Sequence, residues 1–581
     1  MKKILLALIL LGILIVPIVL AQTFRIQPIT RPKRTELAKN VRLIANTSSA
    51  NDKKLFLEKG CKIIHEMEEE TAIECPSDVV SEFKHMTVED SLLRITSTVE
   101  KTPDYKISDI YTDYYTGATK VWFQGYTGKD RLVAVLDTGV DYGHVNLGNC
   151  SIFYYMYDGE RYPYILESPH PYPENYTDTW KIERPGFSRI AVHFVNISTE
   201  FYFDRIIVKD FFNNTVATYT GKHKDVWTPS ASGDTLYITL ESDYSITDYG
   251  FYIDEVIDGT VEKEYYSPNP WENCTKVIGG WDFVNNDLDP IDDHGHGTHV
   301  SGIIAAGLIP DIFATGIAPD AKIMMGKVCD QYGLCWMSDI MAGIEWAVNG
   351  LKINETRDCF EKCNYNRYCC IKTPGCTVEK VTYPKFLYNC TGTYTETKTM
   401  KPDVISISIG GGLWINKNCD EDPLAKKVNW AVRKGVPVVV AVGNFPYGVS
   451  SPACGSKAIA VGALGSWYYP WEPEYYDWVD FFSGRGYAMK DHGVLAPGVF
   501  VYSTLPGDDY GYMSGTSMAC PHVAGLIALM RQKDPRLPSE SIKRIIFRTA
   551  EDVSYGFLAE DEEYEQGYGR INITSAVNSV R

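Results

Sequence analysis

The chain has 581 residues, of which 45% are hydrophobic and 22% charged, and its formal net charge is −18. The length predicts several domains, and the composition is that of a globular protein, which excludes disordered and collagenous classes. The acidic balance argues against nucleic acid as a partner, because phosphate binding needs clustered Lys and Arg. Fifteen cysteines indicate an oxidising compartment, and the odd count leaves at least one thiol without a partner in the chain.

Residues 1–21 have the pattern of a secretory signal peptide. Lys2 and Lys3 precede an apolar run that ends at Ala21. An uncleaved membrane anchor is the alternative, and Pro17 favours cleavage. No later stretch is long and apolar enough to span a bilayer, so we expect a secreted or cell-surface protein without stable membrane insertion. Glycosylation is expected at N-x-S/T acceptors, which are Asn46, Asn149, Asn175, Asn196, Asn213, Asn273, Asn354, Asn389 and Asn572.

Residues 22–112 form a first unit whose pattern alternates strands and helices. The order β-α-β-β-α-β is predicted, which is typical of small ferredoxin-like α+β units. Cys61 and Cys75 lie at the two ends of the central hairpin, where a cross-strand disulfide would fit.

The residue pattern is different in residues 113–150 and 266–581, where short runs rich in Val, Ile and Ala alternate with helical segments. Such runs predict a parallel sheet with helices on both faces, an α/β architecture. The predicted strands are Arg131–Leu136, Ala321–Val328, Asp403–Ile409, Val436–Val442 and Ala458–Ala463. Ser338 is expected to cap the helix Asp339–Asn349, and Gly350 to end it.

Two insertions interrupt this pattern. Residues 151–265 alternate as strands, notably in Arg189–Val195, Phe201–Val208 and Thr235–Leu240, and predict an inserted β-sandwich. Residues 351–402 form a cysteine-rich excursion, for which a disulfide cluster and a zinc knuckle are the two interpretations.

Two motifs carry the acid and base chemistry. Asp137 ends the run VAVLDTGVD, where open α/β sheets place their sites. A structural aspartate is the alternative, and an aspartic protease is disfavoured because no second copy of the motif occurs. His296 lies in DHGHGTHVSG, which suits a general base at a helix start. A metal cluster of three histidines is the alternative, although the Glu of a zincin helix is missing.

Two further motifs supply a nucleophile and an amide. Ser517 lies in SGTSMACPHVAG, and Pro521 suits the first turn of a helix. The positive end of that helix favours developing negative charge at Ser517, which would otherwise be a simple cap. Asn444 follows a buried strand in AVGNFP, where its amide could donate to an oxyanion or serve a turn.

Together these four motifs, in the order Asp, His, Asn, Ser, resemble the subtilisin-like serine proteases over Thr112–Asn149 and Tyr266–Val577. The resemblance implies Ser517 as nucleophile, His296 as general base, Asp137 as orienting acid and Asn444 as oxyanion donor. It implies protein or peptide substrates and no cofactor for the chemistry.

The resemblance also implies a substrate-binding strand and a specificity pocket. The residues expected there are Ser408, Ile409, Gly410, Gly443, Phe445 and Ser450. Phe445 and Ser450 are uncharged, which predicts an apolar or broad preference rather than cleavage after Lys or Arg. A structural calcium ion is expected at the carboxylates of Asp282, Asp287 and Asp289, with a solvated acidic turn as the alternative.

The first unit resembles the family's inhibitory propeptide, so the chain is expected to be an autoprocessed zymogen with Thr102–Thr112 as the processing zone. The insertion 151–265 loosely resembles a CUB sandwich, which would either capture substrate or stiffen the surface. A catalytically inactive surface adhesion protein is the competing function. The pairs Cys150–Cys274, Cys329–Cys335 and Cys419–Cys454 are expected, with Cys520 as a free, inert thiol.

Overall fold

The computed structural model describes residues 40–95, 98–100, 116–201, 203–266, 270–309, 314–363, 372–381, 387–468, 475–553 and 562–581. The chain forms two compact units, residues 1–89 and 90–581. The expected signal peptide and the expected processing zone 102–112 lie outside the described residues. Across the described ranges, no helix combines the length and the apolar character that crossing a bilayer requires.

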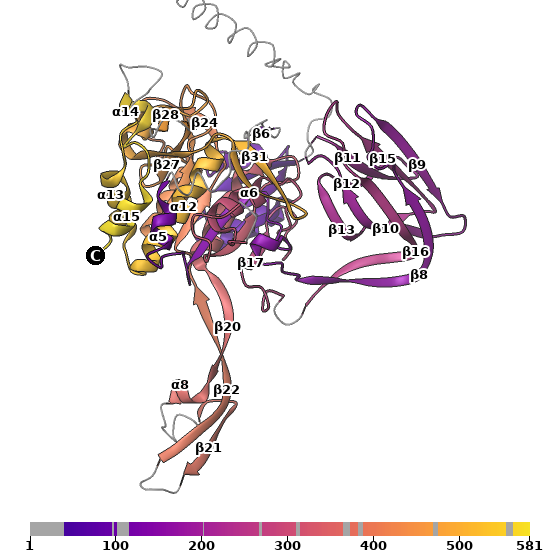
Figure 1. Ribbon diagram of the computed structural model, residues 1–581, viewed down its shortest axis with the longest axis horizontal. Coiled ribbons are helices and arrows are strands. Elements are labelled where there is room, and N and C mark those ends of the chain that lie inside the picture. Colours follow the sequence, from indigo (N-terminus) through magenta and orange to yellow (C-terminus); the bar gives the residue numbers. More distant parts are fainter. Residues whose placement is uncertain are drawn as a thin grey trace, which may run out of the picture. The chain divides into compact units, whose positions relative to one another are not determined.

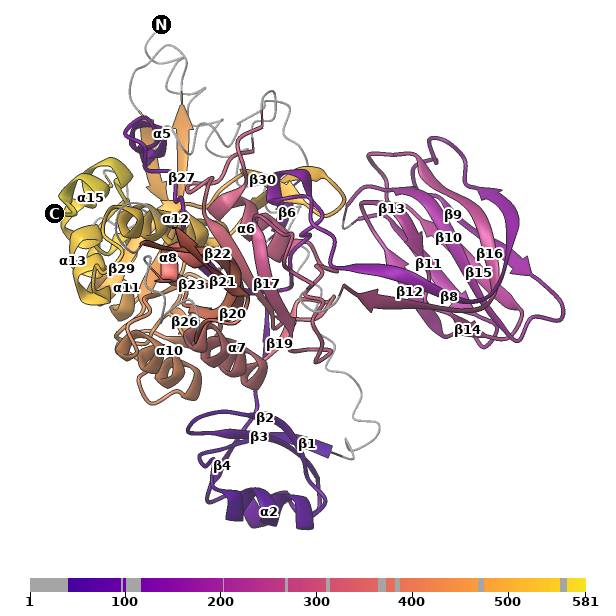
Figure 2. The same ribbon diagram turned by 90° about the horizontal axis from the view of Figure 1, so that it is seen from below.

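The first unit is an antiparallel sheet with two helices (Figure 2). The strands lie in the order β2-β3-β1-β4, which is the order of a ferredoxin-like unit. Phe56 and Phe83, one from each helix, meet edge to face with their ring centroids 5.1 Å apart. Its elements are β1 Asn40–Ala45, α2 Ala50–Glu58, β2 Lys62–Glu66, β3 Thr71–Pro76, α3 Val80–Phe83 and β4 Thr87–Glu89.

An eight-stranded sheet forms the centre of the second unit. Its order is β17-β18-β7-β23-β25-β27-β28, with β29 also paired to β27, and every pair is parallel except β27 with β28. The apolar runs predicted as strands therefore lie side by side in one sheet. Its strands are β7 Leu132–Asp137, β17 Val277–Asp282, β18 Lys322–Lys327, β23 Val404–Ile407, β25 Val438–Ala441, β27 Ile459–Tyr468, β28 Tyr475–Val479 and β29 Gly493–Pro497.

Helices cover both faces of this sheet (Figure 1). Val133 and Val135 of β7 belong to the core that also holds residues of α6 and α12, whereas Leu136 meets α7 at Gly343 on the other face. This alternation follows from the two-residue period of a strand. The helices are α5 Ala118–Trp122, η1 Val145–Leu147, α6 His296–Ala305, α7 Met337–Asn349, α10 Pro423–Arg433, α11 Tyr487–His492, α12 Thr516–Lys533, α13 Ser539–Thr549, α14 Glu562–Gln566 and α15 Ile573–Ser579.

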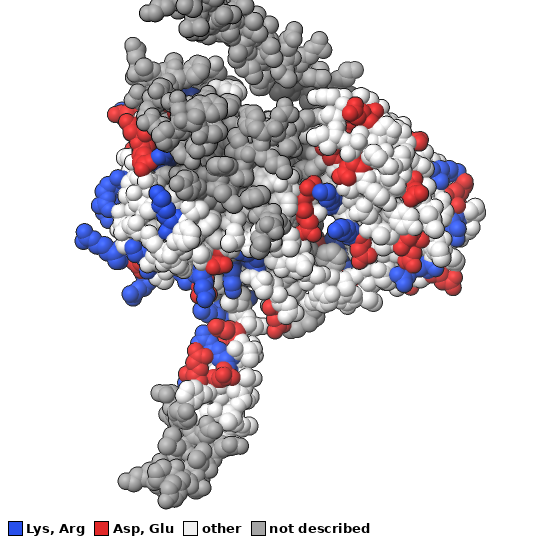
Figure 3. Space-filling model, in the orientation of Figure 1, with Lys and Arg blue, Asp and Glu red and all other residues white. Residues whose placement is uncertain are grey.

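Residues 153–265 form two antiparallel sheets that enclose a hydrophobic core, with Lys/Arg and Asp/Glu interspersed over the face seen in Figure 3. One sheet has the order β13-β10-β16-β8, with β14 paired to β10, and the other has the order β12-β11-β15-β9. The strands are β8 Phe153–Glu167, β9 Thr177–Glu183, β10 Arg189–Ser198, β11 Arg205–Asp210, β12 Thr215–Tyr219, β13 Lys222–Trp227, β14 Ala231–Ser232, β15 Thr235–Glu241 and β16 Gly250–Tyr265. The strand expected to begin at Phe201 begins at Arg205, because Phe201 packs into a different core.

The cysteine-rich excursion extends as a long hairpin of β20 and β22, with α8 and β21 at its far end (Figure 1). Cys359 and Cys376 form a disulfide there, which favours the disulfide interpretation for these two cysteines. The remaining elements of the second unit are β5 Leu92–Arg94, β6 Thr98–Glu100, β19 Leu334–Trp336, β20 Leu351–Asp358, α8 Cys359–Cys363, β21 Cys376–Val381, β22 Leu387–Met400, β24 Gly411–Trp414, β26 Val449–Ser451, β30 Val501–Leu505 and β31 Asp509–Ser514.

The four expected disulfides, Cys61–Cys75, Cys150–Cys274, Cys329–Cys335 and Cys419–Cys454, are present, and Cys520 is free and buried. The expected N-cap of α7 is wrong. Trp336, not Ser338, is the N-cap of α7, because the Ser338 hydroxyl lies inside the helix and donates to Asp90 at 2.6 Å. The Asn572 side chain caps α15 and donates to Glu551, and its glycosylation stays a prediction.

Candidate active site

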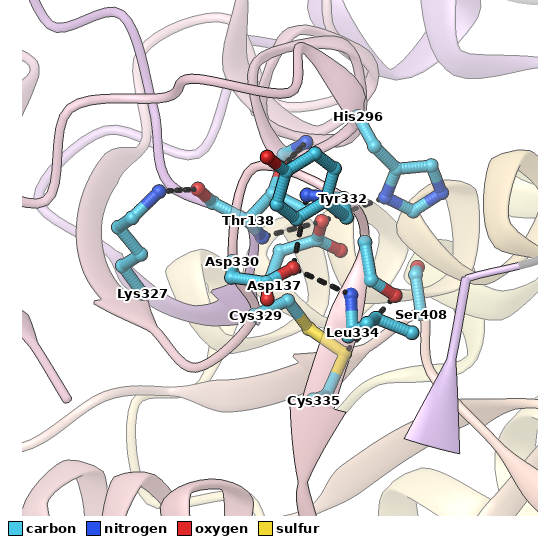
Figure 4. The surroundings of a disulfide bond; sticks show 12 residues. Asp137, Thr138, His296, Lys327, Cys329, Asp330, Tyr332, Leu334, Cys335 and Ser408 are labelled. Atoms are coloured by element: carbon cyan, nitrogen blue, oxygen red, sulfur yellow. Dashed lines mark hydrogen bonds and ion pairs between the residues drawn. A yellow bond between two sulfur atoms is a disulfide. The ribbon is translucent and has the colours of Figure 1, made fainter. Parts of the chain in front are cut away.

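Asp137 and His296 form a buried hydrogen-bonded pair at the carboxyl edge of the sheet (Figure 4). Asp137 is the last residue of β7 and His296 the first of α6, and both are almost inaccessible to solvent. The Nδ1 atom of His296 lies 2.6 Å from Oδ1 of Asp137, which also accepts a bond from the Thr138 N–H at 2.8 Å. A carboxylate in this position selects the tautomer with the proton on Nδ1, which leaves Nε2 as an acceptor.

Asp292 anchors the loop before His296, and the sequence analysis did not identify it. Its Oδ1 accepts bonds from the N–H groups of His294 and Gly295, at 3.0 and 2.8 Å, and its Oδ2 accepts one from Thr298. Burial alone would raise its pKa, but nearby Lys327 and these hydrogen bonds hold the pKa of Asp292 below the ordinary value. The signal available in the sequence was the paired aspartates Asp292 and Asp293, which precede the His-Gly-His pattern.

The other two histidines of the motif do not join His296 in a metal site. Among the described residues, the group with metal-binding geometry lies elsewhere, at Glu200, Asp204 and Asp243. Burial lowers the pKa of His294 to about 4 and that of His299 to about 3, so both are neutral near pH 7.

Ser517 is the second residue of α12, close to the helix N-terminus. Its hydroxyl donates to the Ser408 carbonyl at 3.1 Å, and the Ser408 hydroxyl donates to the Ser517 carbonyl at 3.0 Å. Pro521 lies inside the helix rather than in its first turn, and it lacks the N–H that would bond the Ser517 carbonyl. Because this helix bond is missing, the Ser517 carbonyl can accept a hydrogen bond from the Ser408 hydroxyl instead.

The Nε2 atom of His296 is buried and has no hydrogen-bond partner in the described part of the chain. Catalytic hydrogen bonds are often long or absent until substrate binds. We therefore expect the bond between the Ser517 hydroxyl and Nε2 of His296 to form when substrate is present.

Asn444 is held in one orientation beside Ser517. Its Oδ1 accepts bonds from the N–H and the hydroxyl of Thr516, at 2.8 and 2.9 Å. Because the oxygen end is anchored in this way, the amide nitrogen is the part of the group that can serve a ligand in the neighbouring cavity.

A cavity of about 270 Å³ brings the predicted substrate residues together with Ser517 and Asn444. Gly410 and Gly443 lie against Ser450, whose side chain is 2.8 and 2.4 Å from where a Cβ on each glycine would be. A larger residue at either glycine would therefore clash with Ser450. Its lining includes the six predicted residues Ser408, Ile409, Gly410, Gly443, Phe445 and Ser450.

The chain's own Arg94 and Ile95, at the end of β5, also line this cavity, and no sequence motif predicts them there. Strand β5 pairs antiparallel with β19, and the Ile95 N–H donates to the Gly333 carbonyl at 2.9 Å. Arg94 and Ile95 line the cavity with Ser517. An extended peptide is thus already bound along the edge of the cleft.

The hairpin that carries β19 is closed by the Cys329–Cys335 disulfide (Figure 4). Asp330 folds its turn by accepting bonds from the N–H groups of Tyr332 and Leu334, each at 2.9 Å. The Cys329 N–H lies 3.3 Å from the Asp137 carbonyl, so the hairpin starts directly beside the Asp137 and His296 pair.

The three carboxylates expected to bind calcium are engaged with other partners. Asp282 accepts bonds from the N–H and the side chain of Asn285, whereas Asp289 accepts a bond from Tyr142 and pairs with Lys263 at 3.1 Å. Among the described residues, these three are not a group whose ligand oxygens all lie within 4.8 Å of one another, and calcium binding there stays a prediction.

Comparisons with known proteins identify the family of the chain. Residues 128–569 match the subtilase family. The chain is 31% identical over 383 residues to the thermophilic serine proteinase of Bacillus sp. (strain AK1), which covers 64% of this chain and 75% of the relative. It is 31% identical to subtilisin DY of Bacillus licheniformis, over 52% and 84%, and 31% identical to thermitase of Thermoactinomyces vulgaris, over 48% and 75%.

Proposed function

Because this chain belongs to the subtilase family and is a serine endopeptidase, we propose that it hydrolyses peptide bonds of extended polypeptides through Asp137, His296 and Ser517. The observation that carries the assignment is the buried 2.6 Å contact between His296 and Asp137 beside the cavity that Ser517 and Asn444 line. Secretion follows from the signal pattern at residues 1–21 and the disulfides.

The mechanism follows from the positions of these groups. The Nε2 atom of His296 takes the Ser517 proton as the Ser517 oxygen attacks the substrate carbonyl, and Asp137 stabilises the resulting imidazolium. The carbonyl oxygen becomes an oxyanion, to which the Asn444 amide and the Ser517 N–H at the start of α12 donate. His296 then gives its proton to the leaving amine, and water releases the acyl group by the reverse sequence.

Replacement of the nucleophile tests this mechanism. The Ser517→Ala protein is expected to lose peptide hydrolysis and labelling by a fluorophosphonate, whereas Ser541→Ala in helix α13 should retain both. Full activity of the Ser517→Ala protein would contradict the assignment. A folded wild-type protein that neither cleaves peptides nor reacts with the probe would favour the inactive adhesion protein instead.

The bound segment 92–95 supports a zymogen in which the first unit is an inhibitory propeptide. The backbone of this segment pairs with β19, and Arg94 and Ile95 line the cavity with Ser517. Strand β6 (Thr98–Glu100) pairs with β31, which leads into the helix of Ser517. The chain is therefore present on both sides of the nucleophile. We place the maturation bond between Ile95 and Thr98 rather than in residues 102–112.

N-terminal sequencing of the secreted enzyme tests this position. The mature chain is expected to begin at residue 96, 97 or 98, and Ser517→Ala protein should keep the first unit covalently attached. A mature N-terminus within residues 103–113 would restore the sequence-based processing zone and contradict the proposal.

Calcium takes no part in this mechanism, and its binding at Asp282, Asp287 and Asp289 stays a prediction. Thermal unfolding of the Ser517→Ala protein in Ca²⁺ and in EGTA measures it, because a structural ion stabilises the folded state. An unchanged Tm would contradict a structural calcium ion.

A further inference from the structure

Phe201 belongs to the inserted chain but not to the insert's own core. It lies between β10 and β11, and its side chain is 8% exposed. Its contacts place it in the core of the catalytic sheet and helices, whereas the two insert sheets share a separate core. Phe201 of the insert is thus buried in the catalytic domain.

The Phe201 ring lies between two glycine backbones. A Cβ on Gly221 of the insert would be 2.7 Å from its Cδ2, and a Cβ on Gly295 would be 2.0 Å from its Cζ. Gly295 is the N-cap of α6, whose first residue is His296. The ring therefore packs against Gly295, which directly precedes the proposed general base His296.

Both sides of this contact are fixed by hydrogen bonds. On the insert, the N–H of Thr199 donates to the Gly221 carbonyl at 3.1 Å, and the Gly221 N–H donates to the Thr199 hydroxyl at 2.9 Å. On the catalytic domain, the Gly295 N–H donates to Asp292. Gly295 is consequently held by the Asp292 carboxylate of the catalytic domain and by the Phe201 ring of the insert.

A second contact joins the insert to the segment before the nucleophile. Lys222, the first residue of β13, pairs with Asp509 at 3.0 Å, and its backbone packs against Gly507. Asp509 begins β31, and β31 ends at Ser514, just before the helix of Ser517. The insert therefore contacts the segments that carry the base and the nucleophile.

We propose that Phe201 is a positioning residue for His296 and that the insert holds the backbone around the active site in place. The inference rests on the proposed function. A base displaced by about 1 Å loses on the order of 10²-fold in rate, so a ring that fixes the preceding backbone controls the chemical step. The substrate edge at β19 and Ser408 lies outside this contact, so substrate binding does not depend on it.

Steady-state kinetics with a short chromogenic peptide test the proposal. Phe201→Ala in the secreted enzyme is expected to lower kcat at least tenfold, leave KM within about twofold, and slow fluorophosphonate labelling of Ser517 in parallel. Phe201→Leu should recover part of kcat, because it refills part of the space. Phe211→Ala and Phe212→Ala are the matched controls, since these insert aromatics are 58% and 71% exposed, and both should leave kcat unchanged.

Two outcomes would overturn the proposal. A lowered Tm with kcat within twofold of wild type would make Phe201 a structural core residue only. A loss confined to protein substrates in Phe211→Ala or Phe212→Ala, with Phe201→Leu fully active, would assign the insert to substrate capture. If Phe201→Ala fails to fold, Phe201→Leu carries the kinetic comparison alone. Failure of the proposed function itself would appear separately, as activity in the Ser517→Ala protein.

Discussion

Asn444 is the residue that we propose as the oxyanion donor. Thr516 anchors its amide oxygen by two bonds, so that the nitrogen is oriented before substrate arrives. Asn444→Ala is expected to lower kcat by about 10²–10³ with little change in KM, because the oxyanion forms only in the transition state. Asn444→Asp should be at least as damaging, since it keeps the acceptor, removes the donor and adds a negative charge.

Steady-state kinetics of these two variants check the prediction, with Asn416→Ala at an exposed asparagine as the control. If Asn444→Asp retained wild-type kcat, the amide nitrogen would have no role in catalysis.

Cys520 lies three residues beyond Ser517, and we predict that its thiol is chemically inert. Its thiol is fully buried beside Ser406 and the Ile407 carbonyl. Burial raises the pKa of this thiol to about 12, so that only about one molecule in 10⁴ carries a thiolate at pH 8. Iodoacetamide at pH 8 is expected to leave Cys520 unmodified in the native protein and to alkylate it in guanidinium. Rapid native alkylation, measured by peptide mass, would contradict this.

At the residue level, the sequence predicted the groups whose motifs are long and specific. Asp137, His296, Asn444 and Ser517 each lie in such a motif, and the structure brings them to one edge of the sheet. Asp292 was missed because an acidic residue before a polar loop usually faces water. Only the fold shows that its carboxylate lies inside the loop and accepts its N–H groups.

At the level of elements, near-continuous apolar runs predicted the central strands because both faces of a parallel sheet are buried. Phe201 was assigned to a strand by alternation alone. Alternation reports that a side chain is buried but not in which core, and here the core belonged to another part of the chain. Pro521 was expected in the first turn of the helix but lies further inside it. The sequence did not show that the Ser408 hydroxyl, from another part of the chain, bonds the carbonyl that the missing N–H would have bonded.

The β19 hairpin makes a prediction at the same level. The Cys329–Cys335 disulfide spans six residues and closes the hairpin whose outer strand binds the chain's own segment. A bridge over so short a loop contributes modestly to global stability. We therefore expect the Cys329→Ser/Cys335→Ser double variant to raise KM several-fold for a tetrapeptide amide while kcat is largely kept.

A single-residue ester, which does not reach β19, is the control substrate, and its KM should not change. An equal loss on both substrates would show that the disulfide supports the Asp137 and His296 pair instead.

For the whole molecule, buried neutral histidines predict loss of stability in acid. Burial lowers the pKa of His294 and His522 to about 4 and that of His299 to about 3, against about 6.5 in the unfolded chain. Between these values the unfolded chain binds protons that the folded chain does not. The free energy of unfolding therefore falls as pH drops below about 6.5, by up to about 1.4 kcal/mol per pH unit for each histidine, and is unaffected by them above it.

Urea unfolding of the Ser517→Ala protein at several pH values between 7.5 and 4 measures this dependence without autolysis. Carboxylates contribute to the same slope, so the matched variant is Ser517→Ala/His522→Gln, which has no titrating group at this position. Its stability relative to the parent should improve steadily as pH falls from 6.5 to 4, by about 3 kcal/mol in total, because the parent alone loses the contribution of His522. A difference that stays constant with pH would mean that His522 is protonated as readily in the folded protein as in the unfolded chain.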